Sequence, residues 1–93
     1  MEITRVKIVP ANEAHLKAYV TITIDDCFLI TDIKLIRSSK AYYVEMPRTK
    51  RANGKYVDIV APLNNQTRQL IEEKVFAEYE KITGEPVTRR KLK

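Results

Sequence analysis

Four basic side chains lie close together near the middle of the chain, in the segment from Pro47 to Lys55. They are Arg48, Lys50, Arg51 and Lys55, and no acidic residue lies among them. Lysine and arginine at this density suit phosphate groups, because each neutralised phosphate releases counterions and adds salt-dependent affinity. The chemistry predicted for this segment is the binding of a polyanion. The alternative is a solvated basic loop without a ligand.

A fifth cation, Arg68, is predicted in the first turn of a helix. That turn ordinarily prefers acidic side chains, because the free backbone N–H groups there carry partial positive charge. A cation at this position is consistent with an anion bound at the helix N-terminus. The nucleic-acid-binding residues predicted from the sequence are therefore Arg48, Lys50, Arg51, Lys55 and Arg68.

Aromatic residues flank the basic segment. Tyr42 and Tyr43 precede it and Tyr56 follows it. Aromatic rings can stack on nucleic-acid bases. Packing in the hydrophobic core is the competing explanation, and it is the better one for at least one residue of each alternating pair.

Catalytic and metal-binding sites are not predicted. The only glycines are Gly54 and Gly84, so there is no glycine-rich phosphate loop. Cys27 and His15 have no second cysteine or histidine with which to hold a metal ion. We therefore expect no catalytic residue, no metal, no cofactor and no small-molecule substrate.

The acidic residues of the N-terminal half are interpreted structurally. Asp25 and Asp26 are adjacent at a strand end, where aspartates make turns by bonding to nearby backbone groups. Asp32 falls within a strand, and we interpret it as an edge residue or the partner of a lysine or arginine rather than a catalytic acid.

Composition indicates one small globular domain. The chain has 93 residues, a formal charge of +5, 44% hydrophobic and 31% charged residues. No apolar run is long enough for a membrane helix and the N-terminus lacks a signal-peptide pattern. With a single cysteine and no disulfide, the predicted location is the cytoplasm. The basic charge favours a polyanionic partner, although small proteins that bind no nucleic acid are also often basic.

Alternating apolar residues predict strands along the first two thirds of the chain. Leu16–Ile24 alternates cleanly, whereas Ile3 is out of phase with the rest of the first strand, which a bulge would explain. Asn53-Gly54 indicates a hairpin turn, because these residues tolerate positive φ. The predicted strands are 2–9, 16–24, 27–37 and the two hairpin arms 41–46 and 56–61.

After Pro62 the apolar period becomes helical. Asn64 or Asn65 is expected to cap the helix, and Gly84 followed by Pro86 to end it. The apolar positions at helical spacing are Leu70, Ile71, Val75, Tyr79 and Ile82. The predicted fold is α+β: a small twisted antiparallel sheet of about five strands with a C-terminal amphipathic helix.

The predicted domain spans residues 1–86. Residues 87–93 are predicted to form a basic, flexible tail, whose cations lack acidic neighbours. These cations are Arg89, Arg90, Lys91 and Lys93.

Taken in order, several segments resemble the stage V sporulation protein G family (septation protein SpoVG). The resemblance covers nearly the whole chain to about Ile82. It lies in ITIDDCFLITDIKLI at 22–36, VEMP at 44–47 with the basic residues after it, the Asn-Gly turn, YVDIVAP at 56–62, and the asparagine-rich helix start with Arg68 and the later Glu78-Tyr79.

The resemblance implies a bacterial homodimer that binds DNA and RNA, regulates gene expression and affects septation and sporulation. By position, the nucleic-acid-binding role falls on the five cations named above. The chain departs from the family's usual Gly-Leu-Phe and Met-Pro-Ser at residues 41–43 and 46–48, close to the proposed contact surface, so its sequence preference is expected to differ. At residues 61–62 it has Ala-Pro where the family commonly has His-Pro, so no role of that histidine is carried over. The alternative is a protein-interaction module of the division machinery that uses the sheet edge and the apolar helix face.

Overall fold

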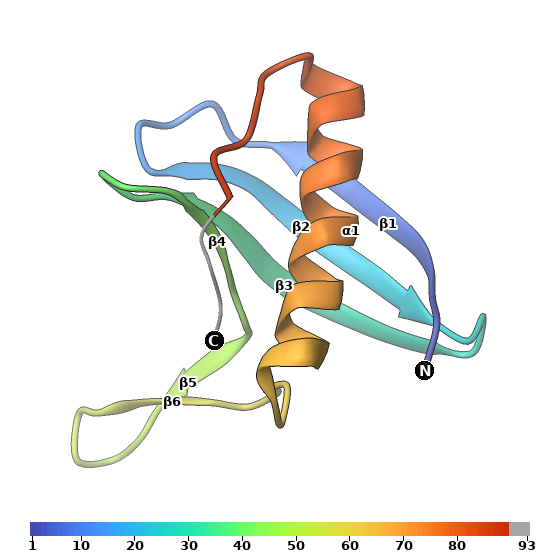
Figure 1. Cartoon of the computed structure of the whole chain (residues 1–93). Helices are drawn as coiled ribbons and strands as arrows, with labels where there is room; N and C mark the ends of the chain where they lie inside the picture. Colours follow the sequence, from blue (N-terminus) through green and yellow to red (C-terminus); the bar gives the residue numbers. More distant parts are fainter. Residues whose placement is uncertain (90–93) are drawn as a thin grey trace.

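The structure, a computed structural model, describes residues 1–89 and consists of six strands and one helix (Figure 1). The strands are β1 (Ile3–Pro10), β2 (Leu16–Ile24), β3 (Phe28–Arg37), β4 (Tyr42–Glu45), β5 (Arg48–Lys50) and β6 (Tyr56–Asp58), and the helix is α1 (Asn65–Thr83). The predicted α+β class, with an antiparallel sheet and a C-terminal helix, is confirmed.

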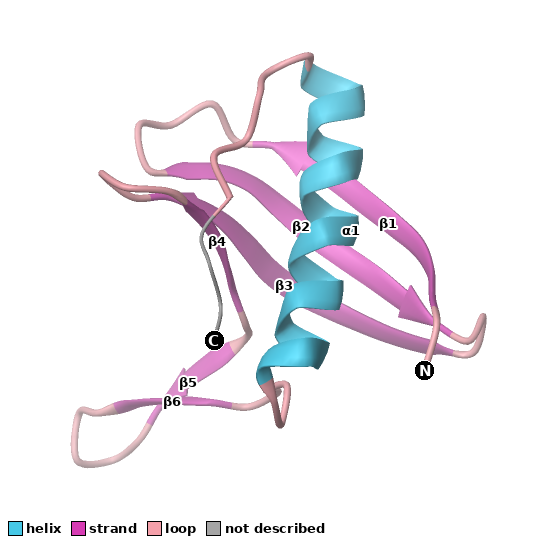
Figure 2. Ribbon diagram, viewed as in Figure 1, coloured by secondary structure: helices cyan, strands magenta, loops and turns pink. Residues whose placement is uncertain are grey.

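Strands β1 to β4 form a four-stranded antiparallel sheet in chain order, and α1 crosses one of its faces (Figure 2). The clean alternation of β2 explains this arrangement. Ala18, Val20 and Ile22 are buried beneath the helix, while Tyr19 between them is 46% exposed on the other face. We call that second face, which α1 does not cover, the open face.

Strands β5 and β6 pair with each other as a separate hairpin that extends away from the sheet (Figure 1). The predicted pairing of 41–46 with 56–61 is therefore wrong. The first of these runs became β4, whose residues pair with β3, because Tyr42 and Val44 bury their side chains in the main core. Pro47 follows, and the chain then leaves the sheet before the hairpin begins.

Three register shifts interrupt the sheet, one of them between Leu16 and Ala18 of β2. The out-of-phase Ile3 is explained as predicted, because the β1–β2 register shifts between Ile3 and Arg5 and both Ile3 and Ile8 are buried. A second bulge, which alternation did not reveal, lies in β3. Ile22 pairs with Ile30 and Val20 with Ile33, so two residues of β3 oppose one residue of β2.

The β3 bulge changes which side chains face the core. Asp32, one of the two residues at the bulge, takes a φ of 61°, a conformation that aspartate tolerates better than most residues. Ile30 consequently packs against the core together with Ile33, while Leu29 lies 60% exposed on the open face. Strict alternation along 27–37 would place Leu29 on the same face as Ile33, and the bulge makes that expectation wrong.

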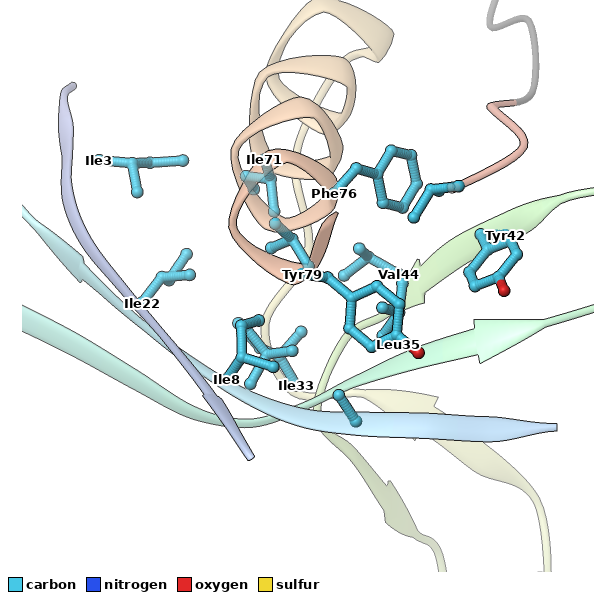
Figure 3. Close-up of a cluster of buried hydrophobic side chains, with 14 of the residues drawn as sticks. Ile3, Ile8, Ile22, Ile33, Leu35, Tyr42, Val44, Ile71, Phe76 and Tyr79 are labelled. Atoms are coloured by element: carbon cyan, nitrogen blue, oxygen red, sulfur yellow. The ribbon is translucent and has the colours of Figure 1, made fainter. Parts of the chain in front are cut away.

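The core lies between α1 and the sheet (Figure 3). From the helix, Ile71, Val75, Phe76 and Tyr79 are buried against β-strand residues such as Ile22, Ile33, Leu35 and Val44. Of the apolar helix positions predicted to be buried, Ile71, Val75 and Tyr79 are confirmed. The prediction is wrong for Leu70 and Ile82, which are 38% and 49% exposed, and it omitted the buried Phe76.

The ends of the helix follow the predicted signals. Asn64 is the N-cap, and its side-chain oxygen accepts a hydrogen bond from the Thr67 N–H at 2.8 Å. Gly84 ends the helix with a φ of 75°, and its N–H donates to the Glu80 carbonyl.

Residues 87–89 pack along the helix. Val87 is buried in the core, and the Thr88 carbonyl accepts from the Tyr42 N–H at 2.9 Å. The expectation that Arg89 lacks an acidic neighbour is wrong. Its guanidinium forms salt bridges with Glu73 at 3.1 Å and Glu80 at 3.0 Å and lies 5.5 Å from the Phe76 ring centre.

The other cations of the predicted tail, Arg90, Lys91 and Lys93, lie outside the described residues, and the domain boundary at residue 86 stays a prediction. Within residues 1–89, no helix is long and apolar enough to cross a membrane.

We predict a pH-dependent loss of stability in the alkaline range that depends on Tyr79. Burial, together with its hydrogen bond to Glu85 at 3.1 Å, raises the pKa of Tyr79 from 10.0 to about 12. The protonated phenol is thus favoured in the folded state, and its contribution is complete below pH 10. Between pH 10 and 12 the unfolded chain ionises first, so the free energy of unfolding falls by up to about 1.4 kcal/mol per pH unit.

Denaturant titrations of the native chain and of Tyr79→Phe across this pH range measure the effect. The native chain should lose stability more steeply than the variant. Equal slopes would contradict the assignment to Tyr79.

Candidate nucleic-acid interface

The β5–β6 hairpin carries four of the five predicted site residues. Arg48 and Lys50 are two apart on β5 and therefore share one face of the hairpin, whereas Arg51 and Lys55 lie in the turn. All four are exposed. The hairpin also holds one acid, Asp58, so its cations outnumber its carboxylates by four to one.

The turn at the hairpin tip is closed by the predicted Asn-Gly pair, with distinct roles for its two residues. Gly54 takes a φ of 84°, and its N–H donates to the Arg51 carbonyl at 2.9 Å. The Asn53 side-chain oxygen accepts from the Lys55 N–H at 3.0 Å. This turn holds the backbones of Arg51 and Lys55 together, because the Arg51 N–H donates to the Lys55 carbonyl at 2.7 Å.

Arg48 already has an acidic partner across the hairpin. Its Nε lies 3.2 Å from Asp58 Oδ1, and its guanidinium lies 6.0 Å from the centre of the Tyr56 ring. Both side chains of the ion pair are more than two-fifths exposed, so the pair contributes little to stability. A phosphate can therefore compete with Asp58 for Arg48.

Arg68 has a structural role that the sequence did not indicate. Its Nη1 donates a hydrogen bond to the Val44 carbonyl at 3.2 Å, and so ties the first turn of α1 to strand β4. Glu72, one turn later, accepts from the Val44 N–H at 3.0 Å. Glu72 lies outside the predicted apolar positions of the helix and is therefore expected on the solvent surface, but this expectation is wrong because Glu72 is only 3% exposed.

These side chains close the outer edge of the sheet. The Val44 N–H and carbonyl point away from β3 and are bound by Glu72 and Arg68, and the Tyr42 N–H is bound by the Thr88 carbonyl. A sheet edge is otherwise a template for pairing with another chain. The β4 edge is thus occupied from within the chain.

The five predicted residues do not form one cluster. Arg48 and Arg68 line a shallow groove of about 500 Å³ at the start of α1, together with Glu45 and Asp58. Lys50, Arg51 and Lys55 do not line this groove. The candidate interface therefore has two parts, the hairpin cations and the Arg48–Arg68 groove, and Arg48 belongs to both.

The three tyrosines near the basic segment occupy different environments. Tyr42 is buried, with its ring centre 6.3 Å from that of Tyr79, so it belongs to the core. Tyr43 is half-buried and lines the Arg48–Arg68 groove. Tyr56 is 60% exposed on the hairpin and is the one of the three that offers most of its ring to a ligand.

A second depression, which the sequence alone did not indicate, lies where the hairpin meets the open face. This cleft has a volume of about 590 Å³. Sheet residues Tyr19, Asp32 and Lys34 line one side, and Arg48, Tyr56 and Ile59 line the other. Strand alternation indicates that Tyr19 and Lys34 point away from the core. It does not indicate where the hairpin lies, and so the cleft could not be predicted from it.

The remaining reactive side chains lie apart from these surfaces. Cys27 is exposed in the β2–β3 turn, and His15 is exposed at the start of β2 with its Nδ1 3.2 Å from the Arg37 carbonyl. Within the described residues, no three His, Cys, Asp or Glu side chains are grouped as ligands for a metal ion.

These features define a small α+β domain in which one helix covers a four-stranded antiparallel meander and a basic hairpin extends from its edge. The chain belongs to the SpoVG family, whose family model matches residues 1–81.

Curated relatives are similar over most of their length. A "Putative septation protein SpoVG" from Bdellovibrio bacteriovorus is 48% identical over 87% of this chain and 75% of its own. Proteins of the same name from Anaeromyxobacter sp. (strain Fw109-5) and Phytoplasma australiense are 47% and 39% identical, over 87% and 94% of this chain and 84% and 92% of their own.

We predict that Glu72 is required for stability although it is charged. Glu72→Ala leaves the buried Val44 N–H without its acceptor, which should lower the free energy of unfolding by about 1–3 kcal/mol. Glu72→Gln retains a side-chain oxygen and should lose less. Chemical denaturation monitored by circular dichroism measures both.

Lys74→Ala, an exposed change on the same helix, is the matched control and should stay within about 0.5 kcal/mol of the native chain. A Glu72→Ala variant as stable as this control would show that the contact with Val44 does not hold β4 in place.

Proposed function

We propose that this protein is a nucleic-acid-binding regulator of gene expression that acts as a homodimer in cell septation and sporulation, through binding rather than catalysis. The observation that carries the proposal is the basic hairpin. Its four cations are exposed, sit on a projecting element and outnumber its one carboxylate. The septation role is supported by the names of the relatives.

A contrast between the hairpin cations and two other arginines supports this proposal. Arg89 is engaged by Glu73 and Glu80, and Arg68 donates to the backbone of β4. Both arginines are therefore engaged by other groups of the fold. A projecting hairpin can follow the groove or backbone of a nucleic acid, where each cation neutralises a phosphate and releases counterions.

A protein-interaction role in the division machinery is the second candidate. The apolar face of α1 cannot serve it, because Ile71, Val75 and Phe76 are buried in the core. A different surface favours it. Ile59 and Leu63, which follow β6, are 63% and 97% exposed, so both side chains are accessible to a protein partner.

Removing two hairpin cations should weaken binding to DNA and RNA alike. We predict that Lys50→Ala combined with Arg51→Ala reduces affinity about ten- to one-hundred-fold at 0.1 M salt and lowers the slope of log affinity against log salt by about two. Electrophoretic shift titrations at several salt concentrations measure both quantities.

The matched control removes the same charge elsewhere. Lys40→Ala combined with Lys74→Ala changes exposed lysines in the β3–β4 turn and on α1, and should leave binding nearly unchanged. Equal losses in both double variants would mean that net charge alone acts. Native binding too weak to measure at moderate salt would favour the protein-interaction role.

The proposed homodimer gives a separate prediction. Sedimentation analysis of the purified chain at the concentrations used for binding should yield twice the mass of one chain. Because the β4 edge is occupied by Glu72, Arg68 and Thr88, a dimer cannot form by strand pairing at that edge without breaking those bonds. The mass of a single chain would contradict the homodimer.

A further inference from the structure

The cleft between the open face and the hairpin has the dimensions of a small-ligand site. Its volume of about 590 Å³ falls in the range of pockets that hold drug-sized molecules. Its two sides come from different elements, since β2 and β3 provide one and the hairpin provides the other. A ligand held there would contact both parts of the molecule.

Aromatic rings line both sides of the cleft. Tyr19 is fixed in the middle of the sheet, where it pairs with Val9 and Lys34, and is 46% exposed. Tyr56 lies opposite Lys50 on the hairpin and is 60% exposed. Exposed tyrosine rings are platforms for flat, aromatic ligands, and each stacked base gains substantial affinity.

The charges in the cleft balance, unlike those of the hairpin. Lys34 and Arg48 line it together with the carboxylates of Asp32 and Glu45. A phosphate group would meet those carboxylates, so it is better placed on the hairpin cations. The exocyclic amino group of a base, by contrast, is a donor that a carboxylate accepts well.

The β3 bulge explains how Asp32 reaches the cleft. The bulge places two residues of β3 opposite one residue of β2, and Asp32 adopts the left-handed conformation there. Bulges often re-aim a side chain next to a functional site. The local irregularity of β3 thus gives the cleft one of its two acceptors.

We propose that this cleft binds one unstacked base of a single-stranded nucleic acid and favours bases that carry an exocyclic amino group. The inference rests on the proposed nucleic-acid binding and adds the class of ligand. Tyr19 and Tyr56 provide the stacking surfaces, Asp32 and Glu45 accept from the amino group, and the hairpin cations hold the neighbouring phosphates. A duplex keeps its bases stacked and cannot place one in the cleft.

The first test separates stacking from charge. Tyr19→Leu and Tyr56→Leu should each lower affinity for a single-stranded oligodeoxycytidine roughly five- to one-hundred-fold, and should leave affinity for duplex DNA unchanged. Phe28→Leu is the matched control, because Phe28 is 63% exposed but is the first residue of β3, next to the β2–β3 turn, and does not line the cleft. It should change neither affinity.

The second test separates recognition by the carboxylates from their charge. Native protein should prefer oligodeoxycytidine over oligothymidine of equal length roughly tenfold, because thymine lacks the amino group. Asp32→Asn combined with Glu45→Gln removes two negative charges, so affinity for both oligomers should rise while the preference falls several-fold. Asparagine is chosen because it tolerates the positive φ of residue 32.

Three results would overturn the inference. They are equal native affinity for the two oligomers, tyrosine variants that weaken duplex and single-strand binding alike, and a tyrosine variant that turns a dimer into a monomer. The last would identify the cleft as a contact between copies. If the double variant Lys50→Ala with Arg51→Ala weakens binding while the tyrosine variants do not, the cleft proposal fails and the proposed function stands. If native protein binds no nucleic acid, both fail.

Discussion

The buried contact between Glu72 and Val44 is the constraint on which the rest of the structure depends. A carboxylate that is 3% exposed is costly to place in a core unless it is well bonded. Here it accepts from the N–H of an edge strand, and Arg68 binds the carbonyl of the same residue. The helix therefore docks on the sheet through polar bonds at its start and through Val75, Phe76 and Tyr79 further along.

Closing one face and one edge of the sheet determines where binding surfaces remain. The helix covers the face that holds the apolar residues of β2, and its polar side chains occupy the β4 edge. The open face and the hairpin stay accessible. Arg68 and Arg89 bond to groups of the fold, whereas Lys50, Arg51 and Lys55 lie exposed at the hairpin.

Local signals predicted the elements well and their partners poorly. Alternation in β2, the Asn64 cap and the Gly84 end were all readable, because each depends on a few neighbouring residues. The pairing of β4 with β3, the burial of Glu72 and the bulge at Asp32 were not. Each depends on a contact with a residue distant in sequence. The hairpin cations were found from their density, whereas the cleft needs Tyr19 and Tyr56 brought together by the fold.

The position of the hairpin within the chain has a consequence for how the protein can vary. Val44 and Glu72 are 28 residues apart, and the hairpin lies inside the loop that their hydrogen bond closes. The entropy of closing a loop grows slowly, so that doubling its length costs only about 0.6 kcal/mol. Insertions, deletions and charge changes in the hairpin therefore leave the helix–sheet body almost undisturbed. This arrangement lets the hairpin sequence diverge between relatives while one scaffold persists.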